Sequence, residues 1–162
     1  MCLGLVCEAL CKTIAANAAP DKTNGNWKVG SELIGRYLSD LGIDKSQFYI
    51  DDASGLSRLN ELSAHTITTV LLHLYNSRNW PLYRDSLAVG GVDGTIAKYF
   101  KEKEYRAKIF GKTGYIDSVK SFSGLASTAQ GDYLFSILAN NANGNTRGAI
   151  NDIAEAIIDE FK

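Results

Sequence analysis

The 162-residue sequence is poor in the residues that define several protein classes. It contains three cysteines, two histidines and two prolines. An odd number of cysteines without a Cys-x-x-Cys spacing favours neither a disulfide framework nor a zinc site. No apolar run approaches the roughly 18 residues of a membrane span. We therefore expect no metal, no cofactor and no membrane span.

The chain also lacks an excess of positive or of negative charge. Lys and Arg number 17 against 18 Asp and Glu, so the formal net charge is -1. A surface that binds nucleic acid concentrates Lys and Arg, because these residues neutralise phosphates. The sequence has no such basic stripe, and we expect no nucleic-acid partner. Small neutral or anionic ligands remain open.

Residues 1–19 superficially resemble a signal peptide, because an apolar run is followed by Ala-Asn-Ala-Ala. A basic first segment is missing, however, and Glu8 lies within the apolar run. Glu8 and Lys12 have instead the i,i+4 spacing of a helical ion pair. We expect no signal peptide in this chain, but a helix that ends before Pro20 and buries its apolar face, on which Cys2, Cys7 and Cys11 lie.

Apolar spacing and capping residues predict the next elements. A loop at 21–28 precedes a helix capped by Ser31 and closed by Gly42, and a short strand follows at 47–50. A turn rich in Ser and Gly then leads into a helix that begins at Ala64, is capped by Ser63 and carries His65 and His73 as ordinary helix residues. A short helix at 80–87, a tight loop at 89–94 and a terminal helix at 149–161 complete the flanking elements.

Residues 105–141 predict three antiparallel strands, at 106–112, 119–128 and 133–139, with Gln130-Gly131 as a tight turn. Apolar residues make up 45% of the chain and charged residues 22%, which is typical of a globular domain. We therefore expect one domain, residues 1–162, of the α+β class, in which helices flank an antiparallel sheet.

Lys112, Thr113 and Gly114 stand at the end of the first predicted strand. A cation, a hydroxyl and a residue without a side chain suit the recognition of a carboxylate, although such a triplet is also common in a solvated turn. A phosphate loop is excluded, because Arg106 stands where that motif requires a glycine and because a strand, not a helix, is predicted to follow.

Six segments together resemble the C-terminal part of the D-alanyl-D-alanine carboxypeptidase/endopeptidase family, the low-molecular-mass penicillin-binding proteins. They are Cys7-Glu8-Ala9-Leu10, Asp52-Ala53-Ser54-Gly55-Leu56-Ser57-Arg58-Leu59-Asn60, Gly91-Val92-Asp93-Gly94-Thr95, Lys112-Thr113-Gly114, Phe122-Ser123-Gly124, and Phe135-Ser136-Ile137-Leu138 before Asn140-Asn141.

The resemblance implies part of a β-lactamase/transpeptidase-like fold and a serine-type peptidase that acts on peptidoglycan peptides. It implies a periplasmic or cell-envelope location, and a peptidoglycan peptide or a β-lactam as ligand. By the same resemblance, Lys112 is a catalytic residue, and Lys112, Thr113, Gly114 and Tyr115 bind substrate, the backbone N–H at position 115 forming half of an oxyanion hole.

Two motifs of the family are missing. No serine has a lysine three positions later, so the Ser-x-x-Lys that supplies nucleophile and base is absent. Cys2-Leu3-Gly4 stands where Ser-x-Asn is expected, and Ser77-Arg78-Asn79 is in the wrong place in the family's order. Ala53 replaces a usual glycine, and Tyr115 replaces a usual small residue.

The sequence thus predicts part of a serine-type carboxypeptidase that is inactive by itself. The alternative is a non-catalytic cell-envelope binding or interaction module derived from the same fold. In that fold the sheet has five strands, two of them from a half that is absent here. We therefore expect strand 133–139, which lacks charge and proline, to be an uncovered edge, and the chain to form a homo-oligomer through this strand or the first helix.

Overall fold

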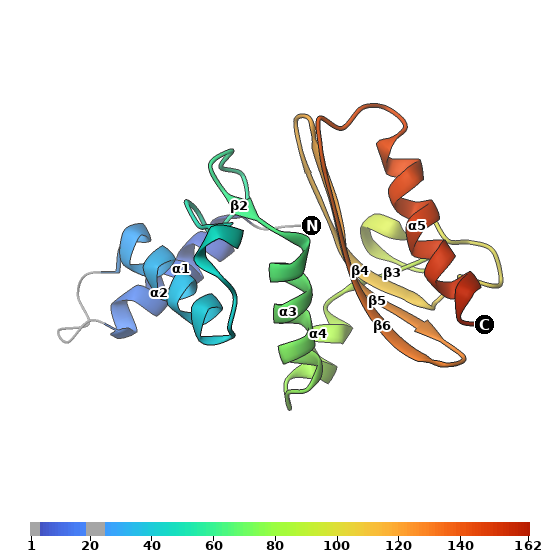
Figure 1. The fold of residues 1–162 in the computed structure, drawn as a ribbon, viewed down its shortest axis with the longest axis horizontal. Coiled ribbons are helices and arrows are strands. Elements are labelled where there is room, and N and C mark those ends of the chain that lie inside the picture. The colour runs from blue at the N-terminus through green and yellow to red at the C-terminus, as the bar shows by residue number, and fades with distance from the viewer. Residues whose placement is uncertain (1–3, 19–24) are drawn as a thin grey trace. The chain divides into compact units, whose positions relative to one another are not determined.

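The computed structural model describes residues 4–18 and 25–162 (Figure 1). The chain divides into two compact units, residues 1–66 and residues 67–162. The mixture of helices with an antiparallel sheet confirms the predicted α+β class. That all 162 residues act as one domain remains a prediction, and Cys2, Leu3 and Pro20 lie outside the described residues.

Two packed helices begin the first unit, α1 (Gly4–Ala18) and α2 (Trp27–Asp40). They approach closely at Gly30, where an added Cβ would lie 2.3 Å from Cys11 Sγ. Cys11 is buried, as predicted, and Cys7 is partly buried. Burial raises the pKa of the Cys11 thiol, with a smaller contribution from Glu8, so this thiol is the less reactive protonated form at neutral pH.

The boundary predicted between the 21–28 loop and the helix that follows it is wrong. Helix α2 begins at Trp27 rather than near Ser31, because the Asn26 side chain accepts a hydrogen bond from the Val29 N–H at 2.9 Å and caps the helix. The loop predicted at 21–28 therefore ends before Trp27. Gly42 does follow the helix end, with φ of +83°.

The expected Glu8–Lys12 ion pair is absent from the described residues. Glu8 Oε1 instead accepts hydrogen bonds from the backbone N–H groups of Ala53 (3.2 Å) and Ser54 (2.8 Å). The Lys12 ammonium lies 4.0 Å from the centre of the Trp27 ring. Glu8 thus ties α1 to the Ser/Gly-rich loop, which a helical pairing rule does not reveal.

The rest of this unit is a two-stranded ribbon and the loop that it encloses. A short 3₁₀ helix, η1 (Lys45–Gln47), leads into β1 (Phe48–Tyr49), which pairs with β2 (Glu61–Leu62). The carboxylate of Asp52 organises the loop by accepting hydrogen bonds from the side chains of Ser54 and Asn60 and from the N–H groups of Gly55, Leu56 and Ser57.

Helix α3 (Ala64–Tyr75) confirms the predicted start and cap, since Ser63 Oγ accepts a hydrogen bond from the Thr66 N–H at 2.9 Å. Helix α4 (Trp80–Asp85) follows. Between them, Ser77 Oγ donates to the Leu74 carbonyl at 2.8 Å and accepts from the Asn79 N–H at 3.2 Å. The Ser77-Arg78-Asn79 segment therefore uses its hydroxyl to close a helix end.

The second unit contains a four-stranded antiparallel sheet in the order β3-β4-β5-β6. Its elements are β3 (Ala88–Val89), the 3₁₀ helix η2 (Gly94–Ile96), β4 (Ile109–Ile116), β5 (Val119–Thr128), β6 (Gly131–Asn140) and α5 (Thr146–Glu160). The strand predicted at 106–112 begins and ends later, because Ala107 has φ of +61° and belongs to a turn. The 119–128 and 133–139 strands and the terminal helix are confirmed.

Helices cover both faces of this sheet (Figure 1). Helix α5 packs on one face, where Phe122, Ile109, Ile150 and Ile158 are buried in the core. On the other face, the Arg84 guanidinium of α4 lies 4.6 Å from the centre of the Phe110 ring. Strand β6 forms one edge of the sheet, as predicted.

The loop around Asp52 generates a prediction about acid stability. Burial favours a higher pKa for the Asp52 carboxyl, but the hydrogen bonds that it accepts outweigh burial and hold its pKa below the ordinary value. A lowered pKa in the folded state means that Asp52 stabilises the fold above its unfolded pKa of about 3.9, and that this contribution is lost as pH falls through the folded value.

Asp52→Asn should therefore lower the melting temperature at pH 7, and the difference from wild type should shrink steadily as the pH approaches about 3. Thermal unfolding followed by circular dichroism at a series of pH values measures both. Asp40→Asn is the matched control, because Asp40 is exposed and makes no side-chain hydrogen bond to another described residue. A difference for Asp52→Asn that is the same at every pH would contradict the assignment.

Candidate functional site

The Lys-Thr-Gly motif lies inside strand β4, not at its end as the sequence suggested. The neighbouring strand β3 is only two residues long and pairs Ala88 with Gly111 and Val89 with Phe110. From Lys112 onward, this edge of β4 has no strand partner in the part of the chain that the structure describes. The motif therefore lies where a sheet edge becomes accessible.

Backbone direction along β4 can be worked out from two hydrogen bonds. The Gly90 N–H donates to the Ile109 carbonyl at 2.8 Å on the β3 side, and the Ser127 N–H donates to the Lys108 carbonyl at 2.8 Å on the β5 side. Since the direction alternates along an antiparallel strand, Thr113 and Tyr115 direct their N–H and C=O groups toward the open edge. The edge thus offers backbone donors at the two positions where the resemblance placed ligand contacts.

Lys112 supplies a cation at this edge. Its side chain is exposed, and its ammonium donates a hydrogen bond to the Thr113 carbonyl. Within the described residues Lys112 makes no ion pair. A carboxylate that approached the edge would consequently meet a positive charge that no carboxylate of the described residues neutralises.

The Thr113 side chain contacts a second hydroxyl. Thr113 Oγ1 donates a hydrogen bond to Thr95 Oγ1 at 2.9 Å. Thr95 belongs to η2, which is the next element along the chain after β3. This contact brings together Gly91-Val92-Asp93-Gly94-Thr95 and Lys112-Thr113-Gly114, two of the segments that carry the family resemblance.

A third such segment lies beside the motif on β5. Lys112 is paired with Ser123, and Ser123 is paired with Ser136 on β6, where the two hydroxyls are 2.8 Å apart. Gly124 approaches β4 so closely that an added Cβ would lie 1.9 Å from the Phe110 carbonyl oxygen. The Phe-Ser-Gly segment therefore lets the two strands lie together just before the motif.

Helix α5 contributes a second cation behind the motif. The Arg147 guanidinium lies 3.5 Å from the carbonyl oxygen of Gly114 and 3.5 Å from that of Ser121. Gly114 and Ser121 are directly paired across β4 and β5. Arg147 thus connects the first turn of α5 to the strand pair that carries the motif.

Tyr115 is exposed, with 72% of its surface accessible. Its ring covers none of the core, so nothing in the packing of β4 requires an aromatic residue there. Its backbone N–H keeps the direction described above whatever the side chain is.

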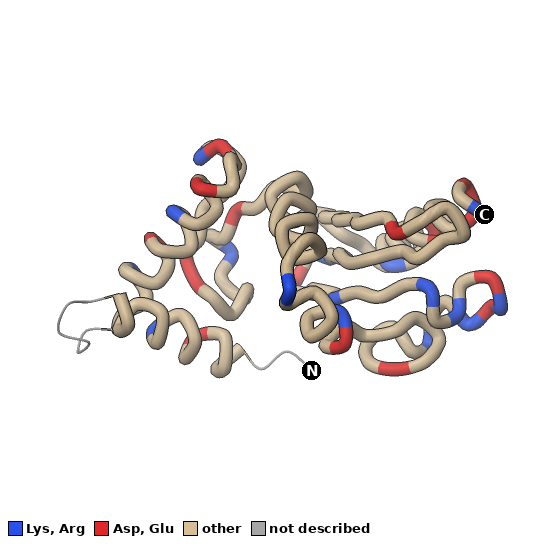
Figure 2. The backbone as a smooth tube through the Cα atoms, turned by 90° about the horizontal axis from the view of Figure 1, so that it is seen from below, with Lys and Arg blue, Asp and Glu red and all other residues tan. Residues whose placement is uncertain are grey.

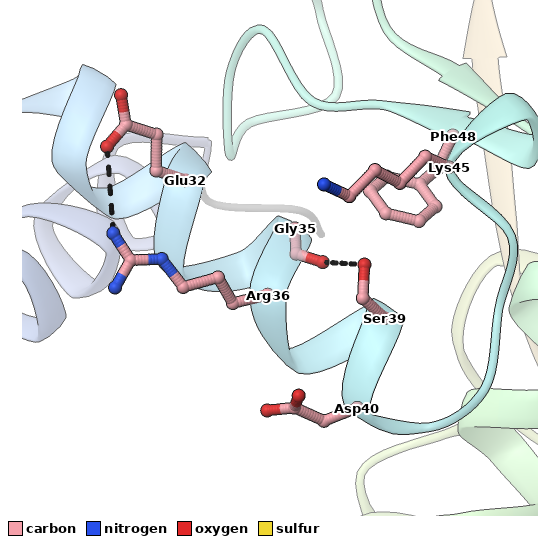
Figure 3. Close-up of a pocket in the computed structure, with 7 residues that line it drawn as sticks. All are labelled: Glu32, Gly35, Arg36, Ser39, Asp40, Lys45 and Phe48. Atoms are coloured by element: carbon pink, nitrogen blue, oxygen red, sulfur yellow. Dashed lines mark hydrogen bonds and ion pairs between the residues drawn. The ribbon is translucent and has the colours of Figure 1, made fainter.

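The pockets of the first unit are weaker candidates for a ligand site than the β4 edge. The one in Figure 3 has a volume of about 550 Å³ and is lined by Glu32, Gly35, Arg36, Ser39, Asp40, Lys45 and Phe48. Three of its polar side chains have partners of their own: the Ser39 hydroxyl donates to the Gly35 carbonyl at 3.1 Å, and Arg36 lies 4.0 Å from Glu32. Charges of both signs and a wide opening give it no preference for one ligand.

Other site types lack support in the described residues. His65 and His73 both lie on α3, and no described group of His, Cys, Asp or Glu could hold a metal ion. Lys and Arg positions, like Asp and Glu positions, are distributed along the whole described chain (Figure 2). None of the described helices combines the length and the hydropathy that a membrane crossing requires.

The sequence predicted Lys112, Thr113, Gly114 and Tyr115 as site residues, and all four lie on β4 beyond its pairing with β3. Their role in binding stays a prediction. Sequence reasoning did not find Arg147, and it quoted Thr95 only as part of a motif. The contact between Thr95 and Thr113 joins residues 18 positions apart, and no periodic pattern reports such a distance. Of the segment Cys2-Leu3-Gly4, which stands where the family's Ser-x-Asn is expected, only Gly4 is among the described residues.

Solved structures with a similar fold include proteins from two bacteria. Penicillin binding protein 4 (dacB) from Haemophilus influenzae, complexed with a β-lactam, superposes with a TM-score of 0.82 at 21% identity, covering 98% of this chain and 39% of that one. A predatory endopeptidase from Bdellovibrio bacteriovorus in complex with an immunity protein gives a TM-score of 0.66 at 22% identity, covering 95% and 43%. These matches confirm the expected partial fold.

Sequence relatives are consistent with these structural matches. The D-alanyl-D-alanine carboxypeptidase of Actinomadura sp. (strain R39) is 31% identical over 160 residues, which are 95% of this chain and 29% of that protein. Penicillin-sensitive carboxypeptidase A of Dictyostelium discoideum is 29% identical over 150 residues, or 88% of this chain and 28% of that protein. The chain therefore spans about three tenths of the length of these relatives. Residues 5–160 also match the model of one family, and the chain belongs to it: the D-Ala-D-Ala carboxypeptidase 3 (S13) family.

Proposed function

We propose that this chain forms the Lys-Thr-Gly side of the active site of a serine-type D-Ala-D-Ala carboxypeptidase that acts on peptidoglycan peptides in the periplasm or cell envelope. The observation that carries the proposal is the open edge of β4, where Lys112 presents a cation that no described carboxylate neutralises. The C-terminal carboxylate of a peptide, or the carboxylate of a β-lactam, is the matching ligand.

Each residue of the edge has a role in this proposal. The Lys112 ammonium attracts the ligand carboxylate, and the Thr113 hydroxyl takes part in the recognition of the same group. The Tyr115 N–H points toward the edge and supplies one donor to the oxyanion that forms when the peptide carbonyl is attacked. An extended peptide can lie along the edge as an added strand, since the backbone groups of Thr113 and Tyr115 have no strand partner there.

The nucleophile is the missing part. Without a Ser-x-x-Lys, no serine of this chain is followed by a lysine base one helical turn later. Serines near the Asp52 loop use their hydroxyls internally, since Ser54 donates to Asp52 and Ser57 donates to Asp51. We therefore propose that the chain alone binds ligand but does not acylate. The absent motif also favours the second candidate, a non-catalytic cell-envelope binding module that uses the same edge.

The first test concerns ligand binding. Acetyl-D-Ala-D-Ala titrated into the ¹⁵N-labelled chain should shift the amide signals of β4, and Lys112→Met should weaken its affinity at least tenfold, about 1.4 kcal/mol. Methionine keeps most of the side-chain stem but removes the charge. Lys108→Met, which removes an exposed cation just before β4, is the control and should bind as wild type. Equal affinity for Lys112→Met and wild type would show that the motif is structural.

The second test concerns covalent chemistry. Because the chain has no Ser-x-x-Lys, incubation of the purified chain with benzylpenicillin should leave its intact mass unchanged. Mass spectrometry of the undigested protein measures this directly. A stoichiometric gain of the mass of penicillin would refute the prediction and identify a nucleophile that the motif search missed.

The third test concerns assembly. We propose that the chain forms a homodimer or larger oligomer through β6, whose outer edge no strand of the described chain covers. Residues 133–139 have neither charge nor proline, and Leu138 is 37% exposed, so little opposes pairing with another copy. Light scattering over a concentration series should show association at micromolar concentrations.

Leu138→Lys should shift this chain toward the monomer, because it places a charge on the edge strand. Leu82→Lys, at a side chain that is 79% exposed on α4, is the control and should associate as wild type. An oligomer that Leu138→Lys leaves intact would place the interface on α1, where Val6, Leu10 and Ile14 are exposed. A wild-type monomer at high micromolar concentration would rule out the proposal.

A further inference from the structure

The hydroxyl of Thr95 occupies a defined place beside the Lys-Thr-Gly motif. Thr113 Oγ1 donates its proton to Thr95 Oγ1 at 2.9 Å. A hydroxyl has one proton to donate and two lone pairs that accept. With this geometry the Thr113 proton is already used, whereas the Thr95 hydroxyl has no acceptor for its own proton among the described residues.

The backbone around Thr95 is fixed although its side chain is exposed. On one side, Gly94 has φ of +62° and an added Cβ would lie 2.6 Å from Ala88 Cβ, so the turn fits tightly against β3. On the other side, Ile96 is completely buried in the core. Asp93 fastens the same turn by accepting a hydrogen bond from the Val89 N–H at 2.8 Å. Thr95 is therefore held between a turn and a core residue.

A carboxylate at the open edge would find the two hydroxyls in series. The Thr113 hydroxyl donates to Thr95, and the Thr95 hydroxyl has a proton to give to an anion. Hydrogen bonds arranged in a chain polarise one another, so an oxygen that accepts a hydrogen bond becomes a stronger donor. The Lys112 ammonium lies at the same edge, where it bonds to the Thr113 carbonyl.

We propose that Thr95 is the direct hydroxyl donor to the ligand carboxylate, and that Thr113 acts through it as a positioning residue. This inference rests on the proposed carboxylate-binding function and adds a residue to that site. It differs from a site in which Thr113 turns away from Thr95 and binds the ligand by itself. In a relay, removal of either hydroxyl breaks the same chain of hydrogen bonds.

A double-mutant cycle tests the relay, with acetyl-D-Ala-D-Ala as the probe and NMR titration as the measurement. Thr95→Val and Thr113→Val should each weaken binding about tenfold, as loss of a hydrogen bond to a charged group predicts. The double variant should also lose about tenfold, not the hundredfold of two independent contacts. Thr95→Ser restores the hydroxyl and should bind within about twofold of wild type, which a purely structural role of Thr95 would not require.

Thr128→Val is the matched control for the loss of an exposed threonine hydroxyl. Thr128 lies at the far end of β5, where its hydroxyl donates to the Gly131 carbonyl, and its replacement should leave affinity unchanged. Amide spectra of all variants establish that each is folded.

Two results would overturn this inference alone: wild-type affinity for Thr95→Val, or a hundredfold loss in the double variant that shows independent contacts. A wild-type chain that does not bind the probe would overturn the proposed function and this inference together. The two kinds of failure are distinguished by the wild-type titration.

Discussion

The Phe122 side chain is the packing element on which the 67–162 unit depends. Its ring is fully buried, lies nearly parallel to Phe100 with centres 6.0 Å apart, and meets Phe135 edge-on at 5.0 Å. A Cβ added to Gly111 would come within 2.6 Å of this ring, so the ring occupies the space that a side chain on β4 would need. Phe122 therefore fixes β4 at the residue just before Lys112.

This packing explains how a rigid core and an open edge occur on the same strand. Ile109 and Gly111 are buried under the aromatic cluster, whereas Lys112 and Tyr115 are exposed only a few residues later. Strand β3 reaches along β4 only as far as Gly111, so the outward-facing backbone groups beyond it are held in place by the core but have no strand partner in the described chain. Of these groups, the Thr113 carbonyl accepts a hydrogen bond from the Lys112 ammonium. Such an arrangement preorganises binding groups at little conformational cost.

Local signals in the sequence predicted what local interactions decide. Ser63 before the apolar run of α3 was recognised as a cap because its hydrogen bond spans three residues. The start of α2 was missed because both Asn26 and Ser31 are good capping residues, and the sequence does not show which one the chain uses. Strand β4 was predicted too early because nothing in the sequence marks Ala107 as a residue with the positive φ of a turn. The motif residues were recognisable by resemblance, but Arg147 and Thr95 reach the site only through tertiary packing.

The order of elements along the chain also has a consequence for biosynthesis. Helix α5 follows all four strands of its sheet, yet it supplies Ile150, Ala154 and Ile158 to the core beneath them. On the ribosome, β4, β5 and β6 emerge before the helix that covers their apolar face, and Phe122 has no cover on that side until then. The core beneath the sheet can be completed only after α5 has left the exit tunnel. A nascent chain in which β4, β5 and β6 have emerged before α5 would present both an apolar face and the uncovered β6 edge to chaperones.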